Sequence, residues 1–188
     1  MKIYVVRHGQ TDENANCIMQ GRTINSQLNR RGIMQATEVK NALKDIKFTA
    51  CFTSPLVRAW STAMIIAGDK VEIKQDDRLI ERYLGELEGK DRTTYDVEKY
   101  WDYNLNSNDK DVEPIQDILV RCEDFIKYLK DNYKSDDNIL IVTHSAIVKM
   151  IQNIFENKEY PEKLIAYDIK NGYYKCYNIW GDICDKRS

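Results

Sequence analysis

The two histidines of this chain stand in equivalent places at opposite ends of the sequence. His8 ends the apolar run 2–7, and His144 ends the apolar run 138–143. Runs of β-branched and aliphatic residues of this length are typical of buried parallel strands. Because open α/β sheets bind ligands at the carboxyl ends of their strands, we expect the two imidazoles to share one site. An imidazole there can be a nucleophile, a base or a phosphate ligand.

Two arginines lie close to the same predicted strand ends. Arg7 precedes His8 and Gly9, so a guanidinium and backbone amides can converge on one anion. Arg58 follows Ser54-Pro55, which predicts a helix capped by Ser54 with Pro55 as its first residue. Arg58 would then lie in the first turn, at the positive end of the helix dipole.

A carboxylate completes the set. Glu81 precedes Arg82 in a segment that contains Gly85 and Gly89. Phosphoryl transfer needs cations around the phosphate, an in-line nucleophile and an acid for the leaving oxygen. The residue types fit this chemistry: His8 as nucleophile, Glu81 as acid, and a clamp of Arg7, Arg58 and His144.

The elements that would position these residues alternate along the chain. Strands are predicted at 2–7, 48–53, 71–74, 138–143, 163–169 and 173–179. Apolar residues at three-four spacing predict helices over 30–46, 115–134 and 145–157. This order predicts an α/β fold, with a mostly parallel central sheet and helices on both faces.

The segment 90–113 differs from the rest of the chain. It is charged, rich in tyrosine and weakly patterned, and one helix is predicted near 94–105. We interpret it as an excursion that covers the site as a lid. The 188 residues otherwise predict one domain over 1–188.

Composition excludes several function classes. The net charge of −2 gives no argument for a nucleic-acid or membrane partner. The apolar run at 2–7 is broken by Arg7, so it predicts neither a signal peptide nor a membrane span. Five cysteines without a Cys-x-x-Cys pair argue against a disulfide framework or zinc site. We therefore expect a cytoplasmic protein.

Four ordered blocks together resemble the histidine phosphatase superfamily, which contains the cofactor-dependent phosphoglycerate mutases. They are Arg7-His8-Gly9-x-Thr11-x-x-Asn14, the Thr53–Ala63 stretch around Arg58, Glu81 with Gly85 and Gly89, and Thr143-His144. The resemblance covers essentially the whole chain. It implies a three-layer α/β/α sandwich of the phosphoglycerate mutase-like kind.

The resemblance also implies roles for the matching residues. His8 would be phosphorylated transiently, and Glu81 would protonate the leaving alcohol and then activate water. The remaining positions would bind the phosphoryl group or the adjoining substrate: Arg7, Arg58, His144, Asn14, Gln20 and Gly21. The family needs no metal or other cofactor for this reaction, because the protein supplies the positive charge.

The chain departs from the family pattern at three places. Ser145-Ala146 follows the second histidine where glycine is usual, which predicts backbone strain if that turn needs a positive φ. Glu113 lies in Val112-Glu113-Pro114 where a Gly-Glu-Ser sequence is common. In the altered segment 25–29, Asn29 is expected to cap the following helix all the same.

Several alternatives stay open at this stage. Arg82 either contacts substrate or pairs with Glu86 or Glu88, and Arg22 is interpreted as a solvated charge. The aromatic residues of 95–103 either face the substrate or pack the excursion on its own domain.

The reaction has alternatives as well. The length of the chain resembles the compact phosphatase branch, which predicts a phosphomonoesterase for a small phosphorylated metabolite, as a monomer or homodimer. A phosphoglycerate mutase and a phosphate-binding module with little turnover are the alternatives.

Overall fold

A five-stranded sheet with the order β3-β2-β4-β1-β5 forms the centre of the computed structural model. The structure describes residues 1–96, 98–156 and 169–180. Strands β1 to β4 run parallel to one another, and β5 runs antiparallel to β1. The strands are β1 (Lys2–Arg7), β2 (Ala50–Thr53), β3 (Ile73–Gln75), β4 (Asn138–Thr143) and β5 (Tyr174–Asn178). The predicted mostly parallel sheet is confirmed.

The register of the sheet brings the two histidines together. β1 and β4 are adjacent, and Arg7 is paired with Thr143 at their carboxyl ends. The pairing extends one residue beyond β1, since the amide of His8 donates to the carbonyl of Thr143 at 2.9 Å. The two histidines therefore leave the sheet side by side, as their sequence positions predict.

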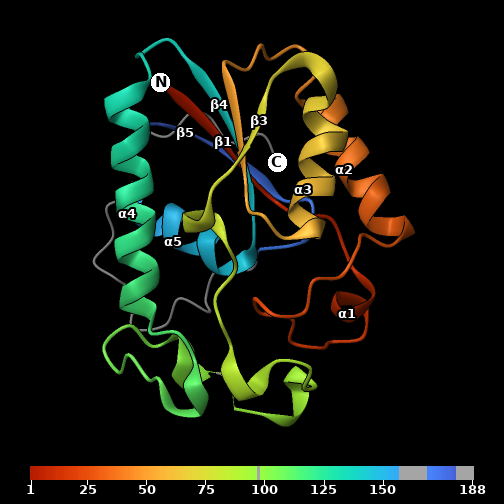
Figure 1. Cartoon of the computed structure of the whole chain (residues 1–188), viewed down its shortest axis with the longest axis vertical. Helices are drawn as coiled ribbons and strands as arrows, with labels where there is room; N and C mark the ends of the chain where they lie inside the picture. Colours follow the sequence, from red (N-terminus) through yellow and green to blue (C-terminus); the bar gives the residue numbers. More distant parts are fainter. Residues whose placement is uncertain (97, 157–168, 181–188) are drawn as a thin grey trace.

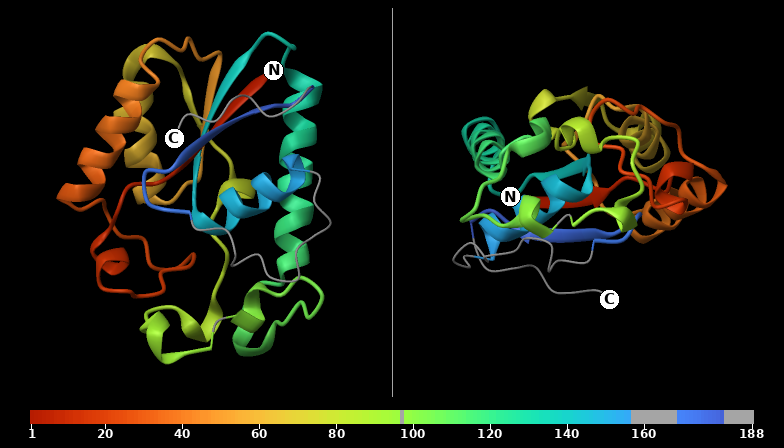
Figure 2. Two further views of the ribbon diagram at one scale, coloured as in Figure 1. Left: turned by 180° about the vertical axis from the view of Figure 1, so that it is seen from behind. Right: turned by 90° about the horizontal axis from the view of Figure 1, so that it is seen from below.

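Helices cover both faces of the sheet (Figure 1). Figure 2 shows the same arrangement from behind, with α4 and α5 on one side and α2 and α3 on the other. Ile3 and Val5 of β1 pack with the α4–α5 layer, whereas Tyr4 and Val6 pack with the α2–α3 layer. The helices are α1 (Asp12–Ala15), α2 (Arg30–Ala42), α3 (Val57–Ala67), α4 (Ile115–Asn132) and α5 (Ser145–Phe155). The three-layer prediction is confirmed.

Several predicted boundaries were wrong. The strand predicted at 48–53 begins at Ala50, and the one at 71–74 is Ile73–Gln75. The helix predicted over 30–46 ends at Ala42, and Leu43 caps it. Residues 163–168 of a predicted strand lie outside the described residues.

The helix predicted near 94–105 was also wrong. The described residues there form short 3₁₀ turns, Arg92–Thr94 and Glu98–Trp101. Asp91, Asp96 and Asp102 each accept from a backbone amide two residues further on, so local side-chain bonds compete with a longer helix.

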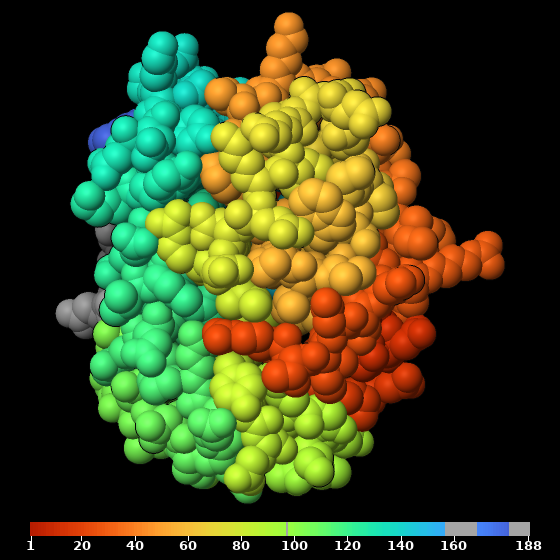
Figure 3. All heavy atoms as spheres, viewed as in Figure 1, coloured from red at the N-terminus to blue at the C-terminus, as the bar shows by residue number. Residues whose placement is uncertain are grey.

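The excursion lies beside the carboxyl ends of the strands and contacts the N-terminal loop. Met19 donates its amide to Lys90 at 2.9 Å, and Gly89 donates its amide back to Met19 at 2.8 Å. In Figure 3 the red N-terminal loop accordingly lies against the yellow-green segment. Two segments distant in sequence thus form one wall around the strand ends. None of the helices in the described ranges is long and apolar enough to cross a membrane.

Candidate active site

The imidazole of His8 is held in one tautomer. Its Nδ1 lies 2.7 Å from the carbonyl oxygen of Gly9, which can only accept, so Nδ1 carries the proton. The Nε2 lone pair is then available for attack. His8 is 2% exposed, and burial together with the positive charges of Arg58 and Arg7 lowers its pKa well below the usual value. A neutral histidine with a bare Nε2 is the form that a nucleophile requires.

The turn after His8 depends on close backbone packing. The amide of Gly9 donates to Thr62 Oγ1 at 3.1 Å. A Cβ atom at Gly9 would clash with the backbone of Gly32 in α2. Glycine is therefore needed at position 9 so that this turn can approach the backbone of Gly32. This turn presents the Gly9 carbonyl to Nδ1 of His8.

His144 lies directly beside His8. The ring centroids are 5.0 Å apart, and His144 is fully buried. Its Nε2 is hydrogen-bonded to Ser54 Oγ at 2.7 Å. Burial, followed by the charge of Arg58, lowers the pKa of His144 well below its usual value.

Ser54 has a different role from the one predicted. Helix α3 begins at Val57 with Leu56 as its N-cap, so neither Ser54 nor Pro55 lies in the predicted capping position. The Ser54 hydroxyl accepts from the amide of Leu56 at 3.2 Å and orients His144. The sequence contains the serine, but its contact with His144 arises from strand pairing between β2 and β4.

Arg58 lies in the first turn of α3, as predicted, and is 1% exposed. It donates to the carbonyl of Gly21 at 2.7 Å and to that of Ile24 at 2.8 Å. In the described part of the chain its Nε has no hydrogen-bond partner. Arg58 therefore positions the Gly21 loop and keeps one donor unused. Arg7 donates to the carbonyl of Ile169.

Asn14 and Gln20 form a polar cluster next to Arg7 and His8. Asn14 completes the capping box of α1 with Thr11. Its Nδ2 donates to Gln20 Oε1 at 3.0 Å, and Asn171 donates to its Oδ1 at 3.0 Å. Two of the predicted substrate-binding residues are thus held by each other and by the loop before β5.

Glu81 approaches the site from the opposite side. Its Oε1 accepts from the amide of Arg82 at 2.9 Å and from the amide of Ala146 at 3.3 Å. The second donor belongs to the first turn of α5, where a helix dipole favours negative charge. The Glu81 carboxylate therefore lies at the N-terminus of α5, the helix that follows His144.

Most of these groups surround one cavity of about 290 Å³, whereas His144 is not among its lining residues. Seven predicted site residues line it: Arg7, His8, Asn14, Gln20, Gly21, Arg58 and Glu81. Lys149 and Arg92 line it as well, and sequence analysis missed both. Lys149 follows Ser145 by four residues, so both lie on one face of α5. This spacing was the signal in the sequence that could have placed Lys149 at the site. Among the described lining residues Glu81 is the only carboxylate, so the cavity suits an anion.

Comparison with known proteins identifies the family. Residues 3–182 match the model of the histidine phosphatase superfamily (branch 1). The chain belongs to the histidine phosphatase superfamily. The predicted family is therefore confirmed, and the predicted enzyme class, a phosphoric monoester hydrolase, agrees with it.

Individual relatives of this superfamily member cover different shares of it. Phosphoglycerate mutase-like protein 4 of Arabidopsis thaliana is 29% identical over 97% of this chain and 85% of the relative. Fructose-2,6-bisphosphatase TIGAR of Xenopus tropicalis is 33% identical over 66% of this chain, which spans only 48% of that relative. The solved structure of Bacillus stearothermophilus YhfR has a TM-score of 0.83 at 26% identity, covering 93% and 89% of the two chains.

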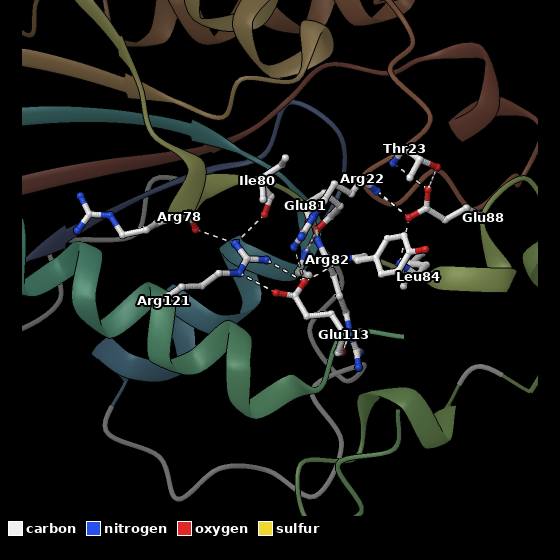
Figure 4. A network of polar contacts seen from close by, with 12 residues as sticks. Arg22, Thr23, Arg78, Ile80, Glu81, Arg82, Leu84, Glu88, Glu113 and Arg121 are labelled. Carbon is white, nitrogen blue, oxygen red and sulfur yellow. Dashed lines mark hydrogen bonds and ion pairs between the residues drawn. The ribbon is translucent and has the colours of Figure 1, made fainter. Parts of the chain in front are cut away.

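The structure corrects the interpretation of two arginines. Arg82 is 1% exposed and lies outside the cavity lining. It donates to the backbone carbonyls of Tyr100 and Glu113, and its guanidinium carbon lies 5.3 Å from the ring centroid of Trp101. The predicted pairing with Glu86 or Glu88 was therefore wrong. Arg22 is not a solvated charge, because it forms an ion pair with Glu113 at 2.9 Å (Figure 4).

The departure after His144 causes no backbone strain. Ser145 is the first residue of α5 and is not among the described residues with positive φ. The backbone at Ser145 therefore has a conformation that any residue adopts, and serine can stand in place of the usual glycine. Asn29 caps α2 as predicted, accepting from the amide of Gly32 at 2.9 Å.

Proposed function

We propose that this histidine phosphatase superfamily member is a metal-independent phosphomonoesterase for a small phosphorylated metabolite, acting through a phosphohistidine on His8. The geometry of His8 carries the proposal. Its Nε2 is unprotonated, its pKa is lowered, and it lines a cavity with Arg7 and Arg58. A neutral imidazole that shares a cavity with two guanidinium groups suits attack on a phosphate monoester.

The proposed reaction has two steps. Nε2 of His8 attacks phosphorus, and the bond from phosphorus to the ester oxygen breaks. Glu81, in its protonated form, gives its proton to the departing alkoxide. The resulting carboxylate then takes a proton from water, whose oxygen attacks the phosphohistidine and releases phosphate. Arg7, Arg58 and His144 stabilise the charge that builds on the equatorial oxygens in both steps.

The cavity favours a compact, anionic substrate. Its volume of about 290 Å³ admits a metabolite rather than a polymer segment. Lys149 and Arg92 add positive charge to the lining, and Tyr100 and Trp101 add aromatic surface. Asn14, Gln20 and Gly21 would contact the part of the substrate next to the phosphate.

We also propose the cytoplasm as the compartment. The cysteines in the described ranges, Cys17, Cys51, Cys122 and Cys176, are free thiols, which are usual in a reducing compartment. The net charge of −2 agrees with a partner that is a small metabolite, with binding charge concentrated in the cavity.

Phosphate release from a panel of phosphate esters in excess EDTA tests the proposal. Wild-type protein is expected to release phosphate without metal, and His8→Ala to lose this activity by on the order of 10⁴-fold or more. Protein quenched in alkaline denaturant, which preserves the acid-labile N–P bond, should carry phosphate on His8 only in the wild type. Conversion of 3-phosphoglycerate to 2-phosphoglycerate without free phosphate would establish a mutase instead. Binding of vanadate with no turnover of any ester would indicate a binding module.

A further inference from the structure

The backbone that carries Glu81 has no regular secondary structure to hold it. Residues 80–84 lie between the 3₁₀ turns Asp77–Leu79 and Gly85–Leu87. The amide of Ile80 donates to the carbonyl of Asp77 at 3.1 Å as the cap of the first turn, but no helix or sheet holds the carbonyl of Ile80 or the backbone of Glu81. A proton donor must nevertheless be held within hydrogen-bond reach of the leaving oxygen, and a displacement of about 1 Å can cost about 100-fold in rate.

Two arginines supply hydrogen bonds to this backbone (Figure 4). Arg121 of α4 donates to the carbonyls of Arg78 and Ile80, each at 2.7 Å. Arg22 of the N-terminal loop donates through Nε to the carbonyl of Glu81 at 3.3 Å. The carbonyls on the N-terminal side of Glu81, and its own, are thus bound by side chains from two distant parts of the chain.

One carboxylate lies between those arginines. Glu113 accepts from Arg121 Nε at 3.0 Å through Oε1, and from Arg22 Nη2 at 2.9 Å through Oε2. The same Oε2 accepts from the backbone amide of Tyr83 at 3.0 Å. The side chain of Glu113 is 13% exposed, so removal of its charge would leave two half-buried arginines without this partner.

The backbone of Glu113 adds two further bonds. Its amide donates to the carbonyl of Tyr83 at 2.9 Å, and its carbonyl accepts from Arg82 Nε at 2.8 Å. Glu113 itself does not line the cavity, whereas Glu81 does. Its effect on the site therefore passes through the segment that carries Glu81.

We propose that Glu113 is a positioning residue that holds Glu81 in place for proton transfer. The proposal rests on the proposed function, in which Glu81 is the proton donor. Glu113 makes no contact with the phosphoryl group in this scheme. It holds Arg22, Arg121 and the amide of Tyr83 in one arrangement, and these fix the main chain on both sides of Glu81.

The test compares Glu113→Gln with a burial-matched control, Glu156→Gln. Glu156 is 10% exposed and pairs with Lys175 away from the cavity. The ratio of kcat for p-nitrophenyl phosphate to kcat for an alkyl phosphate is measured for each variant. Misplacement of the acid should reduce turnover of the alkyl ester by about 10-fold or more and that of the aryl ester far less. The control should leave the ratio unchanged.

Two further measurements separate positioning from general destabilisation. If Glu113 acts through Glu81, adding Glu113→Gln to Glu81→Gln should cause no further change in the ester ratio. Hydrogen exchange of peptides covering 78–87 should be faster in Glu113→Gln than in Glu156→Gln. Glutamine offers one uncharged acceptor oxygen where Arg22, Arg121 and the Tyr83 amide share two carboxylate oxygens.

The outcomes are distinguishable. Equal losses for both esters in Glu113→Gln, or unchanged exchange over 78–87, would overturn the positioning role while leaving the phosphatase intact. Absence of turnover by wild-type protein would overturn the proposed function, and the exchange comparison would still decide whether Glu113 holds the segment.

Discussion

The two sides of the cavity are built in different ways. On one side, His8 and His144 extend from the adjacent strands β1 and β4, and Arg58 lies in the first turn of α3. On the other side, Glu81 lies in an irregular segment that is bound by Arg22 and Arg121. The nucleophile is therefore positioned by backbone pairing, and the acid by side-chain hydrogen bonds.

This difference predicts different responses to substitution. Strand pairing uses backbone groups, which all residues share, so the location of His8 depends little on the side chains of β1, although the following turn requires Gly9. The segment around Glu81 depends on individual guanidinium and carboxylate groups, so single substitutions there can move the acid. Substitutions on the side of His8 and Arg58 should reduce turnover of all esters equally. Substitutions on the side of Glu81 should reduce turnover most for esters with poor leaving groups.

Glu81→Gln tests this distinction with the largest expected effect. Glutamine keeps an acceptor for the amides of Arg82 and Ala146 but has no proton to give. Turnover of alkyl phosphates should fall by about 10²–10⁴-fold, and turnover of p-nitrophenyl phosphate much less, because a good leaving group needs little protonation. Steady-state kinetics with both esters measures this. Equal losses for the two would contradict the acid role.

Arg58→Ala should reduce turnover by about 10²–10³-fold for both kinds of ester, because it removes charge stabilisation rather than proton donation. It should also lower the free energy of unfolding by about 1–3 kcal/mol, since the carbonyls of Gly21 and Ile24 lose their donor. Phosphate release and urea denaturation measure the two effects. Arg31→Ala, at an exposed position on α2, is the control and should change neither. A loss confined to alkyl esters would assign Arg58 to the leaving-group side.

The same division explains what the sequence predicts well. The apolar runs ending at His8 and His144 identify two parallel strands, and parallel pairing alone then brings the histidines together. Asn29 is recognisable as a cap because its contact is local in sequence. Features carried by periodicity or by local capping were therefore predictable.

Contacts made by long side chains across the fold were not predictable in this way. Arg22 and Glu113 are 91 residues apart, and no pattern in the sequence pairs them. Arg82 was expected at the substrate or paired with Glu86 or Glu88, yet it donates to the backbone carbonyls of Tyr100 and Glu113. The helix near 94–105 failed for a related reason, because tertiary contacts rather than propensity organise that segment.

The histidines make the strand-built side sensitive to acid. Burial and neighbouring cations lower the pKa of both His8 and His144 in the folded state, whereas the unfolded chain has the ordinary value of about 6.5. The unfolded state therefore binds more protons below that pH. The contribution of the two histidines to the free energy of unfolding is fully present above pH 6.5. It is lost as the pH falls from there toward their folded-state pKa values.

Each histidine should contribute up to about 1.4 kcal/mol of lost stability per pH unit in this window. Urea denaturation of wild type and His8→Asn at pH 7.5 and 5.5 isolates one of them. Asparagine can still donate to the Gly9 carbonyl, so the variant is expected to lose less stability on acidification than the wild type. Identical pH dependence in the two proteins would mean that folding does not lower the pKa of His8.

The smallest effect is expected for Ser145→Gly, which restores the residue usual in the family. Ser145 lines the cavity, but its backbone is that of an ordinary first helical residue. Glycine should therefore leave kcat/KM within about twofold and lower the free energy of unfolding by less than about 1 kcal/mol. A tenfold rise in kcat/KM would instead show that the hydroxyl narrows access to the phosphate site. An unchanged value would mean that the strand-built side tolerates this departure because backbone pairing and the helix start, rather than a glycine turn, set its geometry.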